Sequence, residues 1–191
     1  MIIRIMDYMM RIILKAVIAL FLISSMAPNM VLATELDNTL YLDLKDGRVT
    51  IEMYPDVAPK TVTRIKELVR EGFYDGLTFH RVIPGFMAQG GDPSGNGTGG
   101  SGQHIPAEFS DLTHLKGTLS MARSDDPNSA DSQFFIVLDV SSHLDGLYTI
   151  WGRVIGGMKY VDHIKEGVVP ALQDPDEIIK MQIAADVKSE E

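Results

Sequence analysis

Residues 39–54, TLYLDLKDGRVTIEMY, alternate apolar and polar side chains on both sides of Asp46-Gly47. A period of two is the pattern of a strand with one buried face. An Asp-Gly pair between two such runs is typical of a tight hairpin turn. The pattern therefore predicts a β-hairpin with its turn at Asp46-Gly47.

Two segments have a helical period instead. From Pro59 to Gly72, apolar residues recur every three or four positions, with proline at the first turn and glycine at the end. Residues 158–165, followed by Gly167, fit a second helix.

Short apolar runs fill most of the remaining chain, and no repeat or linker divides it. Many short strands with two well-separated helices predict a mainly β fold, a closed antiparallel barrel with helices at its ends. The expected strands beyond the hairpin are residues 77–82, 86–89, 117–121, 134–138, 149–154 and 178–187.

The N-terminus has a separate pattern. Basic residues precede the apolar run Ala16–Ser24, and Val31-Leu32-Ala33 offers small or aliphatic residues where a signal peptidase cuts. A membrane anchor is the alternative, but the run is shorter than the ~20 residues that a spanning helix needs. We therefore predict a cleaved signal peptide at residues 1–33 and one domain at residues 34–191.

Translation from Met9 or Met10 would give a more compact signal. Export places the expected location in the periplasm, with secretion as the alternative, and no membrane association after cleavage.

Composition excludes several kinds of site. The formal net charge is −9, which argues against general binding to nucleic-acid phosphates. Cysteine is absent, which rules out disulfides, thiolate metal sites and cysteine nucleophiles. His104, His114 and His163 are scattered and form no ligand pattern, so we expect no metal.

Residues 90–106, GGDPSGNGTGGSGQHIP, contain a G-x-G-x-x-G at Gly95, Gly97 and Gly100. A dinucleotide loop of this kind needs a helix directly after it. The residues after Gly100 include Gly102 and Pro106 and have no apolar period, and no Gly-Lys-Ser/Thr follows. We expect neither nucleotide nor any other cofactor here.

The segment FHRVIPGFMAQGGD, residues 79–92, resembles the signature of the cyclophilins, which are peptidyl-prolyl cis-trans isomerases. The resemblance extends through NGTGG at 96–100, GTLSMA at 117–122, SQFFI at 132–136 and LDG…GRV at 144–154. It implies a closed eight-stranded antiparallel β-barrel capped by two α-helices, with the glycine loop beside a groove for extended peptide.

The resemblance also implies the site. Arg81 aligns with the catalytic arginine, and Gln89 with a residue that positions it and binds substrate backbone. His80 is expected to be structural, because the reaction requires no proton transfer. The substrate-binding positions implied are Phe86, Met87, Gly97, Ala122, Arg123, Gln133, Phe135, His143, Leu144 and Tyr148.

Three departures from the family pattern stand out. His143 occupies a position where many relatives have a tryptophan that contributes to cyclosporin binding, so the resemblance implies weak binding of that drug. Tyr148 replaces a pocket histidine. Arg123 begins a more charged run, residues 123–126, beside the groove.

The expected function is catalysis of rotation about X-Pro imide bonds by a monomeric enzyme. Its expected partners are proline-containing peptides and unfolded exported proteins, whose folding it would assist. The alternative is a holdase-type chaperone or peptide-binding module that uses the same groove without catalysis.

Overall fold

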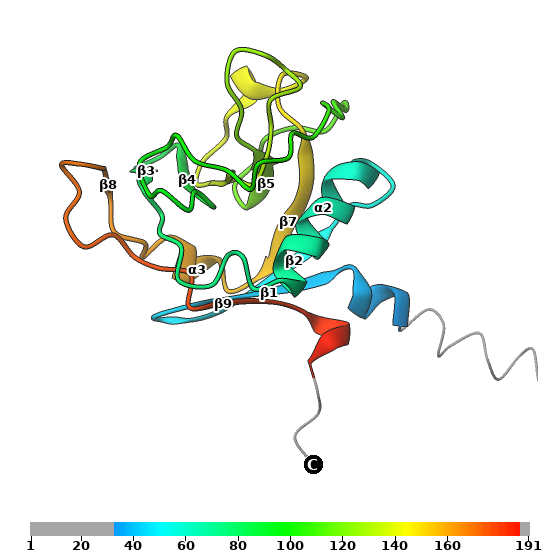
Figure 1. Ribbon diagram of the computed structural model, residues 1–191, viewed down its shortest axis with the longest axis horizontal. Coiled ribbons are helices and arrows are strands. Elements are labelled where there is room, and N and C mark those ends of the chain that lie inside the picture. Colours follow the sequence, from blue (N-terminus) through cyan, green and yellow to red (C-terminus); the bar gives the residue numbers. More distant parts are fainter. Residues whose placement is uncertain (1–32, 188–191) are drawn as a thin grey trace, which may run out of the picture. The chain divides into compact units, whose positions relative to one another are not determined.

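The computed structural model describes residues 33–187 (Figure 1). Residue contacts divide the chain into Met1–Leu36 and a compact unit, Asp37–Glu191, which holds every strand. The predicted signal peptide lies, apart from Ala33, outside the described residues. Within residues 33–187, no helix is long and apolar enough to cross a membrane.

One antiparallel sheet of nine strands dominates the fold, in the order β8-β3-β4-β6-β5-β7-β2-β1-β9 (Figure 1). The predicted mainly β class is confirmed, but the count is nine strands and not eight. The strands are β1 (Thr39–Leu44), β2 (Gly47–Met53), β3 (Arg81–Ile83), β4 (Met87–Gly90), β5 (Thr118–Met121), β6 (Phe134–Val137), β7 (Ile150–Gly156), β8 (Gly167–Val168) and β9 (Lys180–Ile183).

The sheet curls until its two ends approach each other. Its edge strands β8 and β9 do not pair, so the ladder itself is not a closed ring. The segments that precede β3 and β9 join the ends instead: Phe79 N donates to Asp176 O (2.9 Å), and Ile178 N donates to Leu77 O (2.8 Å). The expected closed barrel is therefore a curled sheet with a short hydrogen-bonded seam.

The hairpin forms where the sequence predicts it, but its turn lies one residue earlier. Leu44 pairs with Gly47, so Lys45 and Asp46 make the turn and Gly47 begins β2. A Cβ on Gly47 would lie 2.5 Å from the Tyr160 ring, and its φ is 147°. Position 47 therefore requires glycine, because the Tyr160 ring packs against the start of β2.

Helix α2 (Pro59–Arg70) follows the expected pattern and buries its apolar face. Its first turn lacks a local side-chain cap, and Glu108 supplies one from a distant loop. The Glu108 carboxylate accepts from the backbone N–H of Lys60 (3.0 Å) and of Thr61 (2.9 Å). A carboxylate there satisfies free N–H groups and complements the helix dipole.

Helix α3 (Met158–Val161) is shorter than the expected 158–165. The chain leaves the helix after Val161, and the backbone N–H of Lys165 donates to Asp176 (2.8 Å). The carboxylate of Asp176, a residue outside the helix, therefore binds a backbone N–H group that the next helical turn would have used.

Strand β6, FFIV, is buried on both faces, which explains its unbroken apolar sequence. Phe134 and Ile136 belong to the main core, while Phe135 and Val137 belong to a second apolar cluster on the opposite face. The core side of this strand is packed by edge-to-face rings, among them Trp151 at 6.0 Å from Phe134. The second face is where the candidate site lies.

Candidate active site

Three of the side chains expected at the site lie in one row across neighbouring strands. Arg81 of β3 pairs with Gln89 of β4, and Gln89 pairs with Phe135 of β6. Residues directly opposite each other in an antiparallel ladder project from the same face. The ladder register therefore brings Phe135 together with Arg81 and Gln89, which lie more than 40 residues earlier in the sequence.

Arg81 is held by its neighbours without an ionic partner. Its Nη1 donates to Gln89 Oε1 (3.2 Å) and lies 3.7 Å from the Met87 sulfur. The salt bridges found within residues 33–187 do not include it. The guanidinium charge is therefore not neutralised by a carboxylate and is available to a substrate.

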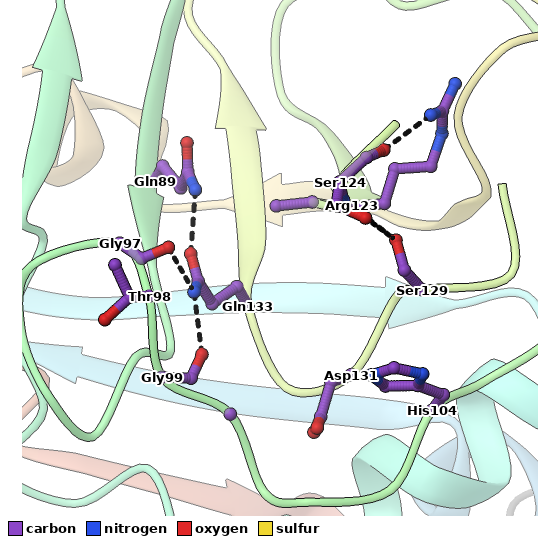
Figure 2. Close-up of a pocket in the computed structure, with 12 residues that line it drawn as sticks. Gln89, Gly97, Thr98, Gly99, His104, Arg123, Ser124, Ser129, Asp131 and Gln133 are labelled. Carbon is purple, nitrogen blue, oxygen red and sulfur yellow. Dashed lines mark hydrogen bonds between the residues drawn. The ribbon is translucent and has the colours of Figure 1, made fainter. Parts of the chain in front are cut away.

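A relay of amides supports Arg81. Because Gln89 Oε1 accepts from the arginine, its Nε2 is free to donate, and it does so to Gln133 Oε1 (2.9 Å). Gln133 Nε2 in turn donates to the carbonyls of Gly97 (3.1 Å) and Gly99 (2.8 Å). Figure 2 shows this chain from Gln89 to the glycine loop. Each amide has one orientation that satisfies its partners.

A cavity of about 130 Å³ with an apolar floor opens beside Arg81. Its floor is Met87, Phe135 and Leu144, which are almost completely buried. Nine of the residues expected at the site line it: Arg81, Phe86, Met87, Gln89, Ala122, Arg123, Phe135, Leu144 and Tyr148. We call this cavity the proline pocket.

His143 has a different place from these residues. It belongs to the short 3₁₀ helix Ser142–Leu144. It does not line the proline pocket, nor the second cavity that adjoins the pocket. Its ring lies against Phe86, with centroids 5.4 Å apart. His143 therefore borders the outer wall of the pocket.

A second cavity of about 340 Å³ adjoins the proline pocket and shares Gln89, Ala122 and Arg123 with it (Figure 2). We call it the loop cavity. Of the three expected residues outside the proline pocket, Gly97 and Gln133 lie here, and His143 lines neither cavity. Sequence reasoning missed several of its polar residues, which stand near Gly97, Arg123 and Gln133 in the chain: Thr98, His104, Ser124, Ser129 and Asp131.

Two carboxylates shape the loop cavity: Asp92, which is buried, and Asp131, which is partly exposed. Asp92 accepts from the backbone N–H groups of Ser94, Asn96 and Gly97, at 2.5 to 3.0 Å. Burial alone would raise the pKa of Asp92, but these donors outweigh it and the pKa is lowered. The N–H groups that a phosphate would need are thus directed at the protein's own carboxylate, and the glycine loop serves as a wall.

Asp131 orders the far side of the same loop. Its carboxylate accepts from Ser101 N (2.7 Å) and Gly102 N (2.9 Å). His80 packs beneath Gly97 and is 3% exposed; desolvation lowers its pKa, which favours the neutral ring. This burial agrees with a structural histidine.

His114 is the residue whose role the sequence hid. Its ring is fully buried and stacks on Phe135 at 6.2 Å. Nδ1 lies 2.8 Å from Asp145 Oδ1, and Nε2 lies 3.2 Å from Ser120 Oγ. Hydrogen bonds to His114 lower the pKa of Asp145. The histidine ties the floor of the proline pocket to the loop that carries Leu144, and only three-dimensional proximity reveals this.

Comparison with known proteins places these features in context. A family model described as "Cyclophilin type peptidyl-prolyl cis-trans isomerase/CLD" matches residues 39–184. A probable peptidyl-prolyl cis-trans isomerase of Brucella suis is 52% identical over 171 residues, covering 82% of this chain and 87% of that protein. Peptidyl-prolyl cis-trans isomerase B of Bacillus subtilis is 47% identical over 134 residues, covering 69% and 93%.

Solved structures give the same picture. A cyclophilin from Hirschia baltica superposes with a TM-score of 0.73 at 29% identity, covering 80% of this chain and 76% of that one. A Cryptosporidium parvum cyclophilin type peptidyl-prolyl cis-trans isomerase, crystallised in the presence of the dipeptide Ala-Pro, superposes with a TM-score of 0.70 at 30% identity, covering 76% and 98%.

Proposed function

The chain belongs to the cyclophilin-type peptidyl-prolyl cis-trans isomerases, and we propose that Arg81 and Gln89 carry out its reaction at the proline pocket. One observation carries the proposal: Arg81, which has no ionic partner among residues 33–187, stands at the edge of a 130 Å³ cavity with an apolar floor and is hydrogen-bonded to Gln89. The proposal assigns the roles of individual residues within a reaction that the family defines.

The reaction needs no bond to be broken. Rotation about a peptide C–N bond faces a barrier of ~18–20 kcal/mol, because resonance delocalises the nitrogen lone pair. The two isomers of an X-Pro bond differ by only ~0.5–1 kcal/mol, yet they interconvert over tens to hundreds of seconds. An enzyme must therefore bind the twisted state, with its pyramidal nitrogen, more tightly than either planar isomer.

Arg81 supplies the group that favours the twisted state. In that state the imide nitrogen regains its lone pair and becomes a hydrogen-bond acceptor. A guanidinium is charged at all relevant pH values and offers several donors in a rigid fork. Gln89 holds one nitrogen of that fork, so the remaining donors are directed by a preorganised network and cost little reorganisation.

The proline pocket holds the ring that rotates against the rest of the peptide. Met87, Phe135 and Leu144 give it an apolar floor, which favours a pyrrolidine ring over a polar side chain. The flanking peptide runs past Ala122 and Arg123 into the loop cavity, where carbonyls and hydroxyls are available to it. Proline-containing peptides are therefore the substrates.

Replacement of Arg81 tests the assignment. In a protease-coupled assay on an X-Pro tetrapeptide, Arg81→Ala is expected to lower kcat/KM by about 100-fold or more, because donors made only in the transition state are lost. Arg153→Ala is the matched control, since Arg153 is an exposed arginine on β7 that pairs with Glu52 of β2. Equal turnover by the wild type and Arg81→Ala would refute the role.

We further propose that the enzyme acts in the periplasm on exported proteins whose folding is limited by proline isomerisation. The support is the pattern of residues 1–33. Expression of the full chain in a Gram-negative host, followed by fractionation and N-terminal sequencing, is expected to give a periplasmic protein that begins at Thr34. A cytoplasmic protein that retains Met1 would overturn this location; recovery from the medium would indicate secretion.

The same arginine separates catalysis of folding from passive binding. If the protein assists folding as an isomerase, Arg81→Ala abolishes its acceleration of a proline-limited refolding reaction. A holdase would protect an aggregating client equally well with or without Arg81.

A further inference from the structure

We propose that the Arg123 side chain is a positioning residue that fixes Tyr148 as a wall of the proline pocket. The inference rests on the proposed function, and it concerns the side chain of Arg123 and not the main chain that flanks the peptide. It joins two residues that the sequence presents as unrelated departures from the family pattern.

Arg123 bridges two loops at the rim of the site. Its Nε and Nη2 both donate to the carbonyl of Leu147, at 3.2 and 3.1 Å. Its Nη1 donates to the carbonyls of Ser124 (2.7 Å) and Asp125 (3.2 Å). One guanidinium therefore ties the segment after β5 to the turn before β7. A forked pair of donors fixes the direction of that tie as well as its length.

The guanidinium also covers an aromatic ring of the pocket. Its carbon lies 4.7 Å from the centroid of the Tyr148 ring, within the range of a cation–π contact. Tyr148 in turn meets Phe135 edge to face, with centroids 5.8 Å apart. Contacts thus run continuously from Arg123 through Tyr148 to the floor of the pocket.

This arrangement solves a specific mechanical problem. Tyr148 lies in a loop, outside the ladder that fixes Arg81, Gln89 and Phe135. No strand register holds its ring, and the neighbouring Leu147 is exposed. The two bonds to Leu147 O and the contact with the ring supply that constraint from the opposite loop. Without them, the wall of the pocket would sample open positions and grip the proline ring less well.

Loss of the constraint should affect binding more than rotation, because Arg81 and Gln89 are held by other contacts. Arg123→Ala is expected to raise KM for an X-Pro tetrapeptide about fivefold, with kcat within about twofold of the wild type. Arg123→Lys keeps the charge but lacks the fork, so its KM should resemble that of Arg123→Ala. Arg153→Ala, which removes an exposed arginine elsewhere, is the control.

A double-mutant cycle with Tyr148→Leu isolates the coupling. In the Tyr148→Leu background, Arg123→Ala should change KM by less than about 1.5-fold, since the ring it positions is gone. An equal effect in both backgrounds, or a wild-type KM in Arg123→Lys, would overturn the proposal and indicate that the charge acts on the substrate directly.

A readout independent of activity keeps this test separate from that of the proposed function. Nuclear Overhauser contacts between the Tyr148 and Phe135 rings are expected in the free wild-type protein and should be lost or weakened in Arg123→Ala. Unchanged ring contacts would refute the positioning role even if isomerase activity fell.

Discussion

The proline pocket and the loop cavity meet at Gln89, yet they are built in different ways. The pocket takes Met87 and Phe135 of its floor from β4 and β6, where ladder register fixes their positions, and Leu144 from the short 3₁₀ helix. The loop cavity takes its walls largely from irregular segments, held by the carboxylates of Asp92 and Asp131.

This difference indicates a division of labour. A ladder fixes the positions of paired residues within a narrow range of distances. This suits a donor that must form a hydrogen bond with a short-lived twisted imide. Loops held by a few hydrogen bonds can accommodate different neighbours of the proline. We therefore expect changes in the ladder-placed row of Arg81, Gln89 and Phe135 to reduce turnover, and changes in the loop cavity to alter binding and sequence preference.

The largest effect is expected from removing the pocket floor. Phe135 is 5% exposed and contacts both His114 and Tyr148. Phe135→Ala should lower kcat/KM by more than about 100-fold and the free energy of unfolding by about 3 kcal/mol. Peptide assays and urea denaturation measure the two quantities. The matching change in the loop cavity, Thr98→Ala, should leave turnover at saturating substrate nearly unchanged.

Gln89 lines both cavities and links Arg81 to Gln133, so its removal should affect both regions. Gln89→Ala breaks one bond to Arg81 and one to Gln133, and we expect kcat to fall about tenfold with a smaller rise in KM. Steady-state kinetics measure both constants. Gln182→Ala, on β9, is the control; a kcat unaffected in both variants would mean that Arg81 needs no support.

Asp92→Asn should act on the loop cavity alone. An amide oxygen cannot replace a carboxylate that accepts three N–H groups, so KM should rise and the free energy of unfolding at pH 7 should fall by about 1–2 kcal/mol. The rate at saturating peptide should stay within about twofold of the wild type.

Low pH should remove the stabilisation that Asp92 gives the wild type relative to Asp92→Asn. Its pKa in the folded protein lies below the ordinary value of 3.8, so the stabilisation is complete above that value and is lost as the pH falls through the lower folded pKa. Urea denaturation of the wild type and of Asp92→Asn, from pH 7 into acid, should show their free energies of unfolding converging as the pH falls. A constant difference down to pH 2 would exclude the charge as its cause.

The smallest effect is expected at the outer wall. His143 contacts Phe86 but lines neither cavity. His143→Trp adds apolar area beside the pocket, and should tighten cyclosporin binding roughly fivefold while leaving peptide turnover unchanged. Calorimetric titration of both proteins measures the affinity; equal affinities would show that this position does not control drug binding.

Sequence patterns predicted the elements better than their ends. Alternation identified the hairpin, but the turn lies one residue earlier, at Lys45 and Asp46, and Gly47 is instead the strand residue that packs under the ring of Tyr160. The period identified α2, while α3 stopped early because Asp176 binds the backbone of Lys165. The two-residue strand β8 is too short to have a pattern of its own and exists through pairing with β3.

The sequence likewise predicted some parts of the site and not others. The sequence motifs indicated the residues of the proline pocket, because each motif carries them in a fixed order along the chain. They did not reveal Asp131 at the glycine loop, the burial of His114 beneath Phe135, or the contact of Arg123 with Tyr148. Each of these joins residues distant in sequence through a loop whose path no local pattern determines.

The central claim is that the row of Arg81, Gln89 and Phe135 determines catalysis and that the loop cavity determines binding preference. The most direct test is NMR exchange spectroscopy of cis-trans interconversion in a bound X-Pro peptide, compared between Arg81→Ala and Asp92→Asn at saturation. We predict that bound-state exchange falls at least about 100-fold in Arg81→Ala and stays within about twofold of wild type in Asp92→Asn. Retained exchange without Arg81, or its loss with only Asp92 changed, would contradict the account.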